Sequence, residues 1–271
     1  MKMTKRVSMW LIVLLMVCSL MGCSKEKELT PEDVYVAAYE KIYSVPGIDV
    51  EMDMDMSMAA EGETMEMGLK ADLLMENPNS EEMKMDMKMT MNMLGIGIDV
   101  QAYYVDGYYL MDMMGQKIKY LMPMDEAMGQ AAMMQEVAVE ALSEITMTEE
   151  DGLRILNYSV DMAKLAEGFM DEYLNNMGMA EMQEGLEYKS MQGVMKVNEE
   201  GYPVEIMMKL EMTMEMEGVQ VDCAADMTAV YNNPGQPVTV EIPDASEYIE
   251  VDAESMNYNK TDDLKKYLDD L

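Results

Sequence analysis

The stretch MKMDMKMTMNM, residues 83–93, decides the expected fold because it places a methionine at every second position. Successive side chains of a β-strand point to opposite faces, so one face of this strand is all methionine. The other face carries lysine, aspartate, threonine and asparagine. The same separation recurs at 51–58 and 207–217. An apolar face backed by a polar face is typical of an antiparallel sheet with one solvated side.

The rest of the chain repeats this strand pattern and interrupts it with helices. Turn signals separate the alternating runs, and the pair Asp106-Gly107 is a strong hairpin signal. Helical spacing of apolar residues predicts helices at 31–45, 124–143 and 161–177, and Thr261 can begin a short one near the C-terminus. We expect ten or so long antiparallel strands in two groups, drawn from 51–58, 64–75, 83–93, 96–105, 108–114, 117–122, 143–148, 153–160, 186–197, 204–217, 219–231 and 238–242.

The N-terminus has the layout of a secretory signal peptide that ends in a lipidation site. A basic start is followed by an apolar run at 7–17 and by the pair Gly22-Cys23. We expect residues 1–22 to be a lipoprotein signal peptide, and Cys23 to become the lipidated first residue. An acyl chain gains about 0.8 kcal/mol per buried CH₂, so this lipid would hold the protein on the outer face of the cytoplasmic membrane. The alternative is a plain signal peptide or an uncleaved anchor.

Beyond the signal, the chain reads as one domain. Residues 23–30 form the lipidated cysteine and a polar tether, and residues 31–250 form a single antiparallel-sheet domain with inserted helices. Residues 251–271 form a polar C-terminal segment with a short helix. Because Cys18 leaves with the signal and Cys23 is lipidated, Cys223 has no partner for an intrachain disulfide.

Charge and composition exclude several classes of function. The formal net charge is −34, so the surface repels nucleic acid and anionic lipid headgroups, and membrane contact must come from the anchor. The sequence contains no histidine, which removes His-based catalytic triads and His-ligated zinc sites. We also find no glycine-rich phosphate loop. We therefore expect no enzymatic activity, no catalytic residues and no cofactor.

The methionine face admits three interpretations. Methionine is unbranched and polarizable, so it adapts to ligands of no fixed shape, such as acyl chains. Equally, the helices can close over the face and make it a filled core. A Cu(I) site is a third and weaker alternative, because the 41 methionines spread over nearly every element, whereas metal sites concentrate their ligands and mix thioether with histidine or thiolate. If a ligand binds, its expected lining is Met52, Met54, Met56, Met83, Met85, Met87, Met89, Met91, Met208, Met212 and Met214.

The overall pattern resembles a known superfamily of lipoproteins. The motif Glu200-Gly201-Tyr202-Pro203, a long alternating strand after it and the closing Val240-Glu241-Ile242-Pro243 carry the resemblance, together with the lipidation motif. The chain is similar to the Lol carriers and the mycobacterial lipid-binding lipoproteins, and most similar to an uncharacterised group of Gram-positive surface lipoproteins. The resemblance implies an unclosed barrel with helices over its concave side, where a lipid or a lipoprotein acyl chain binds.

Pattern and resemblance together define the expected protein. Its fold class is α+β: a large curved antiparallel β-sheet, an unclosed barrel, with helices covering the concave apolar face. Its expected function is that of a membrane-anchored extracytoplasmic lipoprotein that binds or carries a hydrophobic ligand, with a lipoprotein as a possible partner and without nucleic acid. The alternative is a non-catalytic structural or interaction lipoprotein with a filled methionine-rich core.

Overall fold

The computed structural model describes residues 29–42, 44–93, 95–131, 137–165, 186–216 and 218–252. The chain divides into two compact units, Met1–Thr30 and Pro31–Leu271, and every element below belongs to the second. The signal peptide and Cys23 lie outside the described residues, as does nearly all of the C-terminal segment 251–271. The predictions made for them stay predictions.

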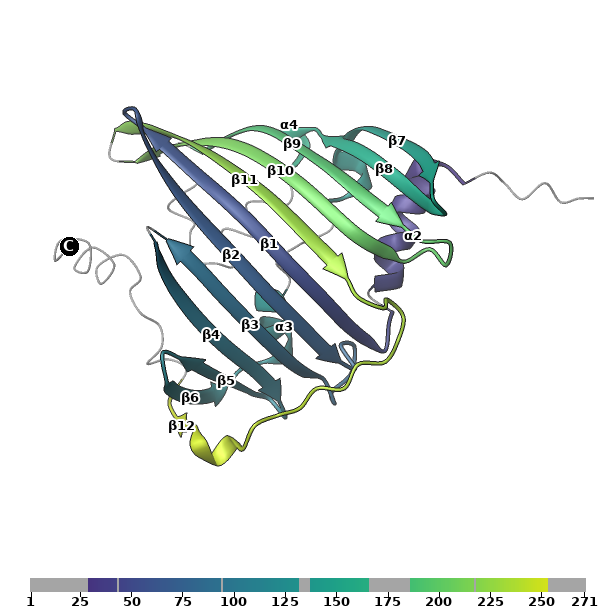
Figure 1. Cartoon of the computed structure of the whole chain (residues 1–271). Helices are drawn as coiled ribbons and strands as arrows, with labels where there is room; N and C mark the ends of the chain where they lie inside the picture. The colour runs from purple at the N-terminus through teal and green to yellow at the C-terminus, as the bar shows by residue number, and fades with distance from the viewer. Residues whose placement is uncertain are drawn as a thin grey trace, which may run out of the picture. The chain divides into compact units, whose positions relative to one another are not determined.

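The described residues form one twelve-stranded sheet with short helices (Figure 1). The strands are β1 Gly47–Ala60, β2 Glu63–Glu76, β3 Lys84–Met93, β4 Ile96–Val105, β5 Tyr108–Met113, β6 Gln116–Leu121, β7 Leu142–Glu150, β8 Leu153–Val160, β9 Glu187–Val197, β10 Pro203–Met216, β11 Val219–Tyr231 and β12 Ile249–Glu250. The helical elements are α2 Pro31–Ile42, α3 Met124–Ala131, η1 Val139–Ala141, α4 Met162–Leu165 and η4 Ala245–Glu247.

The sheet consists of two antiparallel meanders that meet in its middle. Strands β1 to β6 follow one another, strands β7 to β11 do the same, and β11 returns to pair with β1. The order is β12-β6-β5-β4-β3-β2-β1-β11-β10-β9-β8-β7, with β12 parallel to β6 and β7 at the opposite edge. The two edges do not pair with each other, so the sheet is unclosed, which confirms the predicted fold class.

Two-residue turns make the tight hairpins of the first meander. Asp106 and Gly107 have φ values of 51° and 80°, and both positive values are what a type I′ turn requires. Glu61 and Gly62, between β1 and β2, have the same signs. The predicted turn at Asp106-Gly107 is therefore confirmed.

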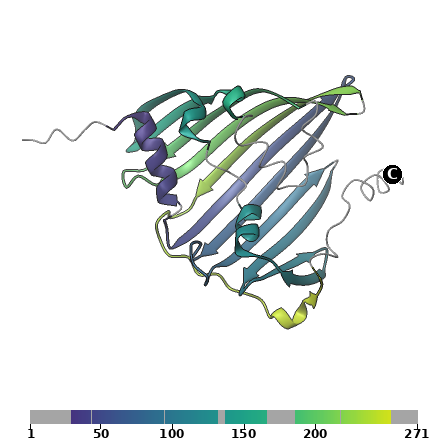
Figure 2. The same ribbon diagram turned by 180° about the vertical axis from the view of Figure 1, so that it is seen from behind.

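Helices α2 and α3 lie on one side of the sheet, which we call the helix face (Figure 2). The face on the opposite side is called the outer face. Buried α2 residues, including Tyr35 and Tyr39, pack with Leu156, Met195 and other side chains of β8 to β10 in one hydrophobic cluster. A second cluster joins Ala127 of α3 to buried side chains of β1 to β5. Each helix thus covers part of one meander.

Close packing inside the first cluster depends on a glycine. The Tyr158 ring of β8 lies over Gly193, its cross-strand partner on β9, where a Cβ atom would collide with the ring. Tyr158 also stands edge-on to Tyr35, with 5.3 Å between ring centroids. A side chain at position 193 would therefore push the Tyr158 ring out of this cluster.

The segment 232–252, which we call the strap, differs from the sequence prediction. We expected a strand at 238–242, and the structure has none there. The Val240 N–H donates to Glu76 Oε2 at 3.1 Å instead of to a neighbouring strand, and Val238 packs against Gly47 with no room for a Cβ. The strap runs past the ends of the β1 to β4 strands and reaches β6, where β12 pairs with it and forms the edge of the sheet (Figure 1).

The predicted helices are shorter in the described residues than the sequence patterns suggest. The helix expected at 31–45 is α2, which ends at Ile42 before Pro46. The helix expected at 124–143 is helical at 124–131 as α3, residues 132–136 lie outside the described residues, and η1 and β7 occupy 139–150. The helix expected at 161–177 begins as α4, and its residues from 166 onward lie outside the described residues.

Candidate functional site

The strand register places all eleven predicted lining methionines on the helix face. Met52 belongs to the cluster under α3, so its side chain points to the helix face of β1. Met54 and Met56 follow at every second position and point to the same face. Met208 of β10, in the cluster under α2, does the same for Met212 and Met214. The methionines of 83–91 share the face because β3 pairs with β2 without a register shift. The predicted separation of faces therefore holds.

The part of this face nearest the helices is a filled core. On β2 and β3 the helix-face side chains at this end of the strands are buried one after another, and Met85 is 0% exposed. Met83, Met87, Met52 and Met208 are buried as well. These five predicted lining residues pack against other side chains of the two clusters, so they serve as core side chains in the described structure.

The same face becomes exposed toward the other end of the strands. On β3, Met87 is buried, Met89 is half-buried, and Met91 and Met93 are 43% and 37% exposed. The remaining predicted lining residues, Met54, Met56, Met212 and Met214, are half-buried. We call the exposed group on β2 to β5 the open surface; it comprises Met65, Met91, Met93, Ile96 and Met113.

Four members of the open surface were missing from the predicted lining. Ile96 lies directly opposite Met93 across the β3–β4 pair, and Met65 lies opposite Met58 across the β1–β2 pair. Met113 lies opposite Val100 on the next strand. The short hairpin turns fix these pairings, so the turn signals in the sequence could have found them.

One cysteine lies within the methionine rows of the helix face. Cys223 of β11 is directly opposite Met58 of β1 on one side and Met212 of β10 on the other. Its side chain is 7% exposed, and burial raises the pKa of the Cys223 thiol. A protonated and buried thiol is a poor nucleophile, so this residue does not suggest covalent catalysis.

Buried tyrosines add polar groups to the cluster under α2. The Tyr35 hydroxyl donates to the Val137 carbonyl at 3.0 Å. Burial raises the pKa of Tyr158 to about 12, and burial with neighbouring phenols raises the pKa of Tyr39. Both phenols therefore stay neutral at physiological pH and do not act as bases.

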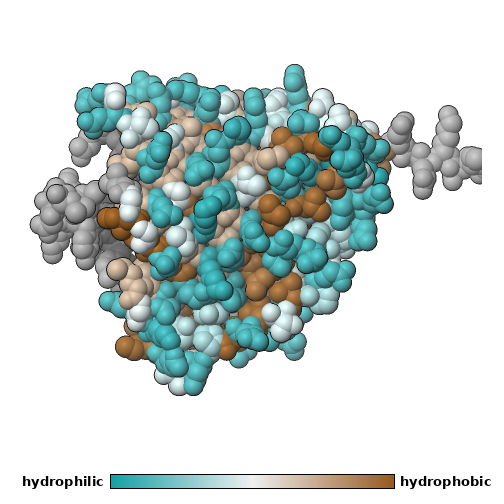
Figure 3. All heavy atoms as spheres, in the orientation of Figure 1, coloured by the Kyte–Doolittle hydropathy of each residue, from teal (hydrophilic) through white to brown (hydrophobic). Residues whose placement is uncertain are grey.

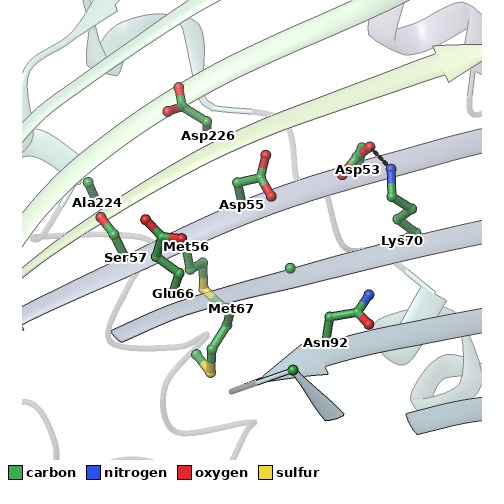
Figure 4. Close-up of a pocket in the computed structure, with 12 residues that line it drawn as sticks. Asp53, Asp55, Met56, Ser57, Glu66, Met67, Lys70, Asn92, Ala224 and Asp226 are labelled. Carbon is green, nitrogen blue, oxygen red and sulfur yellow. Dashed lines mark hydrogen bonds and ion pairs between the residues drawn. The ribbon is translucent and has the colours of Figure 1, made fainter. Parts of the chain in front are cut away.

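The outer face is polar and carries the charged residues of the alternating strands, coloured teal over much of Figure 3. A hollow of about 640 Å³ lies there across β3, β2, β1 and β11, and Figure 4 shows Ala224 and Asn92 at its two sides. Its walls carry four carboxylates, Asp53, Asp55, Glu66 and Asp226.

Lysines pair with two of the four carboxylates that line this hollow. Asp53 pairs with Lys70, as the dashed line in Figure 4 shows, and Asp226 pairs with Lys209 at 2.7 Å. All four side chains are well exposed, so these pairs contribute little to stability. Among the described residues, no three His, Cys, Asp or Glu side chains gather into a metal site. Within the described residues, the hollow therefore has no cluster of ligands suited to a hard cation.

Within the residues that the structure describes, none of the helices has the length and apolar character needed to cross a membrane.

Comparisons with known proteins identify a family and several distant structural likenesses. No curated protein matches the sequence. LprF from Mycobacterium bovis is 10% identical, with 79% of this chain and 96% of that chain covered and a TM-score of 0.39. A DUF1329 family protein from Desulfovibrio piger is also 10% identical, with 80% and 95% covered and a TM-score of 0.25.

A putative outer membrane lipoprotein-sorting protein domain from Vibrio parahaemolyticus is 11% identical, with 80% and 97% covered and a TM-score of 0.19. One family model matches the sequence over most of the sheet domain. The model of a family of unknown function, DUF6612, matches residues 30–247, and the chain therefore belongs to that family.

Proposed function

We propose that this protein binds a hydrophobic ligand, such as a lipid acyl chain, on the open surface. The observation that carries the proposal is the change of exposure along one face of one strand, from Met85 at 0% to Met91 at 43%. Soluble proteins seldom expose contiguous apolar side chains from several adjacent strands without a binding partner. Methionine suits such a surface because its flexible thioether adapts to varied shapes.

The dimensions and charge of the open surface limit which kinds of ligand it can bind. Strands β2 to β5 span three interstrand spacings, or about 14 Å, so an extended chain can lie across them. The β1–β2 turn at this end carries Glu61 and Glu63, which would repel an anionic headgroup. The preferred ligand then has an acyl chain and a neutral polar end.

The proposal includes the membrane anchor and a non-catalytic role. Lipidated Cys23 would hold the protein on the outer face of the cytoplasmic membrane, with residues 24–30 as its tether. The absence of histidine from the sequence supports binding over catalysis. Mass measurement of the full chain extracted from membranes would detect the lipid, and Cys23→Ser should remove it.

The second candidate function is that of a structural or interaction lipoprotein with a filled core. The other half of the same face favours it, because Met83, Met85 and Met87 are buried in a packed cluster. The two functions differ in what the open surface does: it holds a ligand in the first and remains empty in the second.

Native mass spectrometry separates these functions. Residues 24–271, purified without detergent, would be mixed with a neutral diacylglycerol or with anionic phosphatidylglycerol. We expect a discrete added mass with the neutral lipid and less with the anionic one. A bare protein mass in every mixture would contradict ligand binding and favour the filled-core alternative.

A matched pair of variants locates the binding face. Met91→Glu with Met93→Glu places two charges on the open surface and should abolish the added mass. Thr90→Glu with Asn92→Glu places the same charges on the outer face of the same strand and should leave binding unchanged. Equal binding by both variants would exclude the open surface as the site.

A further inference from the structure

We infer that Cys223, Met58 and Met212 form a binding site for a soft monovalent metal ion, Cu(I) or Ag(I). Their strands β1, β11 and β10 are adjacent, and the register sets Met58 and Met212 directly opposite Cys223 on either side. Directly opposite residues have Cβ atoms about 4.5–5.5 Å apart, so long thioether side chains can converge on the central sulfur.

All three side chains belong to the helix face. Met58 follows Met52 at every second position of β1, and Cys223 precedes buried Ala229 in the same way on β11. Met212 follows Met208 on β10. The β1–β11 and β10–β11 pairings run through these positions without a register shift, so no residue is turned to the outer face.

The donor set selects the metal. Thiolate and thioether sulfurs are soft ligands that favour Cu(I), whereas Cu(II) prefers nitrogen and oxygen. Structural zinc sites use four ligands from Cys, His and carboxylates, and this site has one thiol and no histidine. Asp222 and Ala224, the chain neighbours of Cys223, point to the outer face, so the Asp222 carboxylate is not a ligand of this site.

The proposed site differs from the other sets of methionines that lie opposite one another on the helix face. Met54, Met227 and Met208 also lie opposite one another across β1, β11 and β10, but they offer thioethers alone. Binding of the ion would displace the proton of the Cys223 thiol into solvent, and the resulting thiolate adds a negative charge that a row of thioethers lacks. The sequence contains one cysteine after residue 23, and the fold sets it between two methionines.

Burial and access also suit a bound ion. Cys223 is 7% exposed, so water has little access to its sulfur. Met58 is half-buried, and Met65, opposite Met58 on β2, is exposed at the open surface. An ion can therefore enter past Met65, which can supply a further sulfur. The acidic surface of the protein attracts cations toward this entry.

Anaerobic Cu(I) titration against a competing chelator tests the inference. The protein would be the full chain in detergent with Cys18→Ser and Cys23→Ser, so that Cys223 is its one thiol. We expect one Cu(I) per chain and no retention of Zn(II). Cys223→Ser should lower the affinity on the order of 100-fold or more, since even loss of a supporting partner costs about 10–100-fold.

Methionine variants supply the geometric control. Met212→Leu keeps the volume of the side chain and removes its sulfur, so the fold should persist while the Cu(I) affinity falls at least about tenfold. Met227→Leu makes the same change about 13 Å along β11, four residues away, and should leave the affinity unchanged. Circular dichroism would verify that both variants are folded.

The inference would be overturned by Cu(I) affinity that survives Cys223→Ser, or by equal losses for Met212→Leu and Met227→Leu. X-ray absorption of the Cu(I) complex should show sulfur neighbours alone, and nitrogen or oxygen neighbours would also contradict the assigned ligands. The lipid-binding proposal is measured separately, so failure of copper binding leaves it standing, and failure of lipid binding leaves the metal site standing.

Discussion

Replacing Met85 and Met91 by alanine tests whether one strand face is divided into a closed core and an open surface. Both residues lie on the helix face of β3, six positions apart, with the same side chain and the same strand neighbours β2 and β4. They differ in burial: Met85 is 0% exposed and Met91 is 43% exposed. The two substitutions therefore differ mainly in the environment of the deleted atoms.

Burial sets the expected change in the free energy of unfolding. Met85→Ala removes a fully buried side chain and leaves a cavity between its cross-strand partners Met75 and Tyr104, which costs about 2–5 kcal/mol. Met91→Ala removes atoms that already contact water in part, so its cost should stay below about 1 kcal/mol. In a domain of this size, about 3 kcal/mol corresponds to a fall in Tm of roughly 6–12 °C.

Urea unfolding monitored by circular dichroism measures both variants against the parent. We expect Met85→Ala to lower the midpoint strongly and Met91→Ala to leave it nearly unchanged, with similar m-values for all three proteins. Equal losses for the two variants would refute the division of the face, because they would place Met91 in a packed core. A small loss for both would mean that Met85 is not closely packed.

Two further predictions follow from the strap and from the exposure of thioethers. The Val240 N–H and Lys84 lower the pKa of Glu76 below its ordinary 4.5. The stabilisation from the Glu76 carboxylate is therefore complete above pH 4.5 and is lost as the pH falls through the lowered pKa, so the difference in urea midpoint between the parent and Glu76→Gln should shrink on acidification. A difference in midpoint that does not depend on pH would count against this contact. Dilute hydrogen peroxide should convert Met114, 84% exposed, to the sulfoxide well before Met85, and peptide mapping that finds equal rates in the folded protein would contradict the described burial.

Local patterns predicted most of the sheet, because strand alternation and turn chemistry are local properties. The faces of β1, β3 and β10 and the hairpin at Asp106-Gly107 all follow from residues close together in the sequence. The pairing of β1 with β11 joins segments about 170 residues apart, and no turn fixes it. The position of Cys223 between two methionines depends on that pairing, so the sequence alone could not predict it.

The division of the helix face follows from the lengths of the elements that meet there. Strands β1, β2 and β10 contain 14 residues each, which corresponds to about 46 Å. Helix α2 contains 12 residues and is about 18 Å long. An α-helix rises 1.5 Å per residue and a strand about 3.3 Å, so a helix must have more than twice as many residues as a strand to run along all of it. Because α2 and α3 are shorter than the strands that they cover, they bury one part of the methionine face. Alternation cannot reveal where that cover ends, since an alternating methionine looks the same in the sequence under a helix and beyond it.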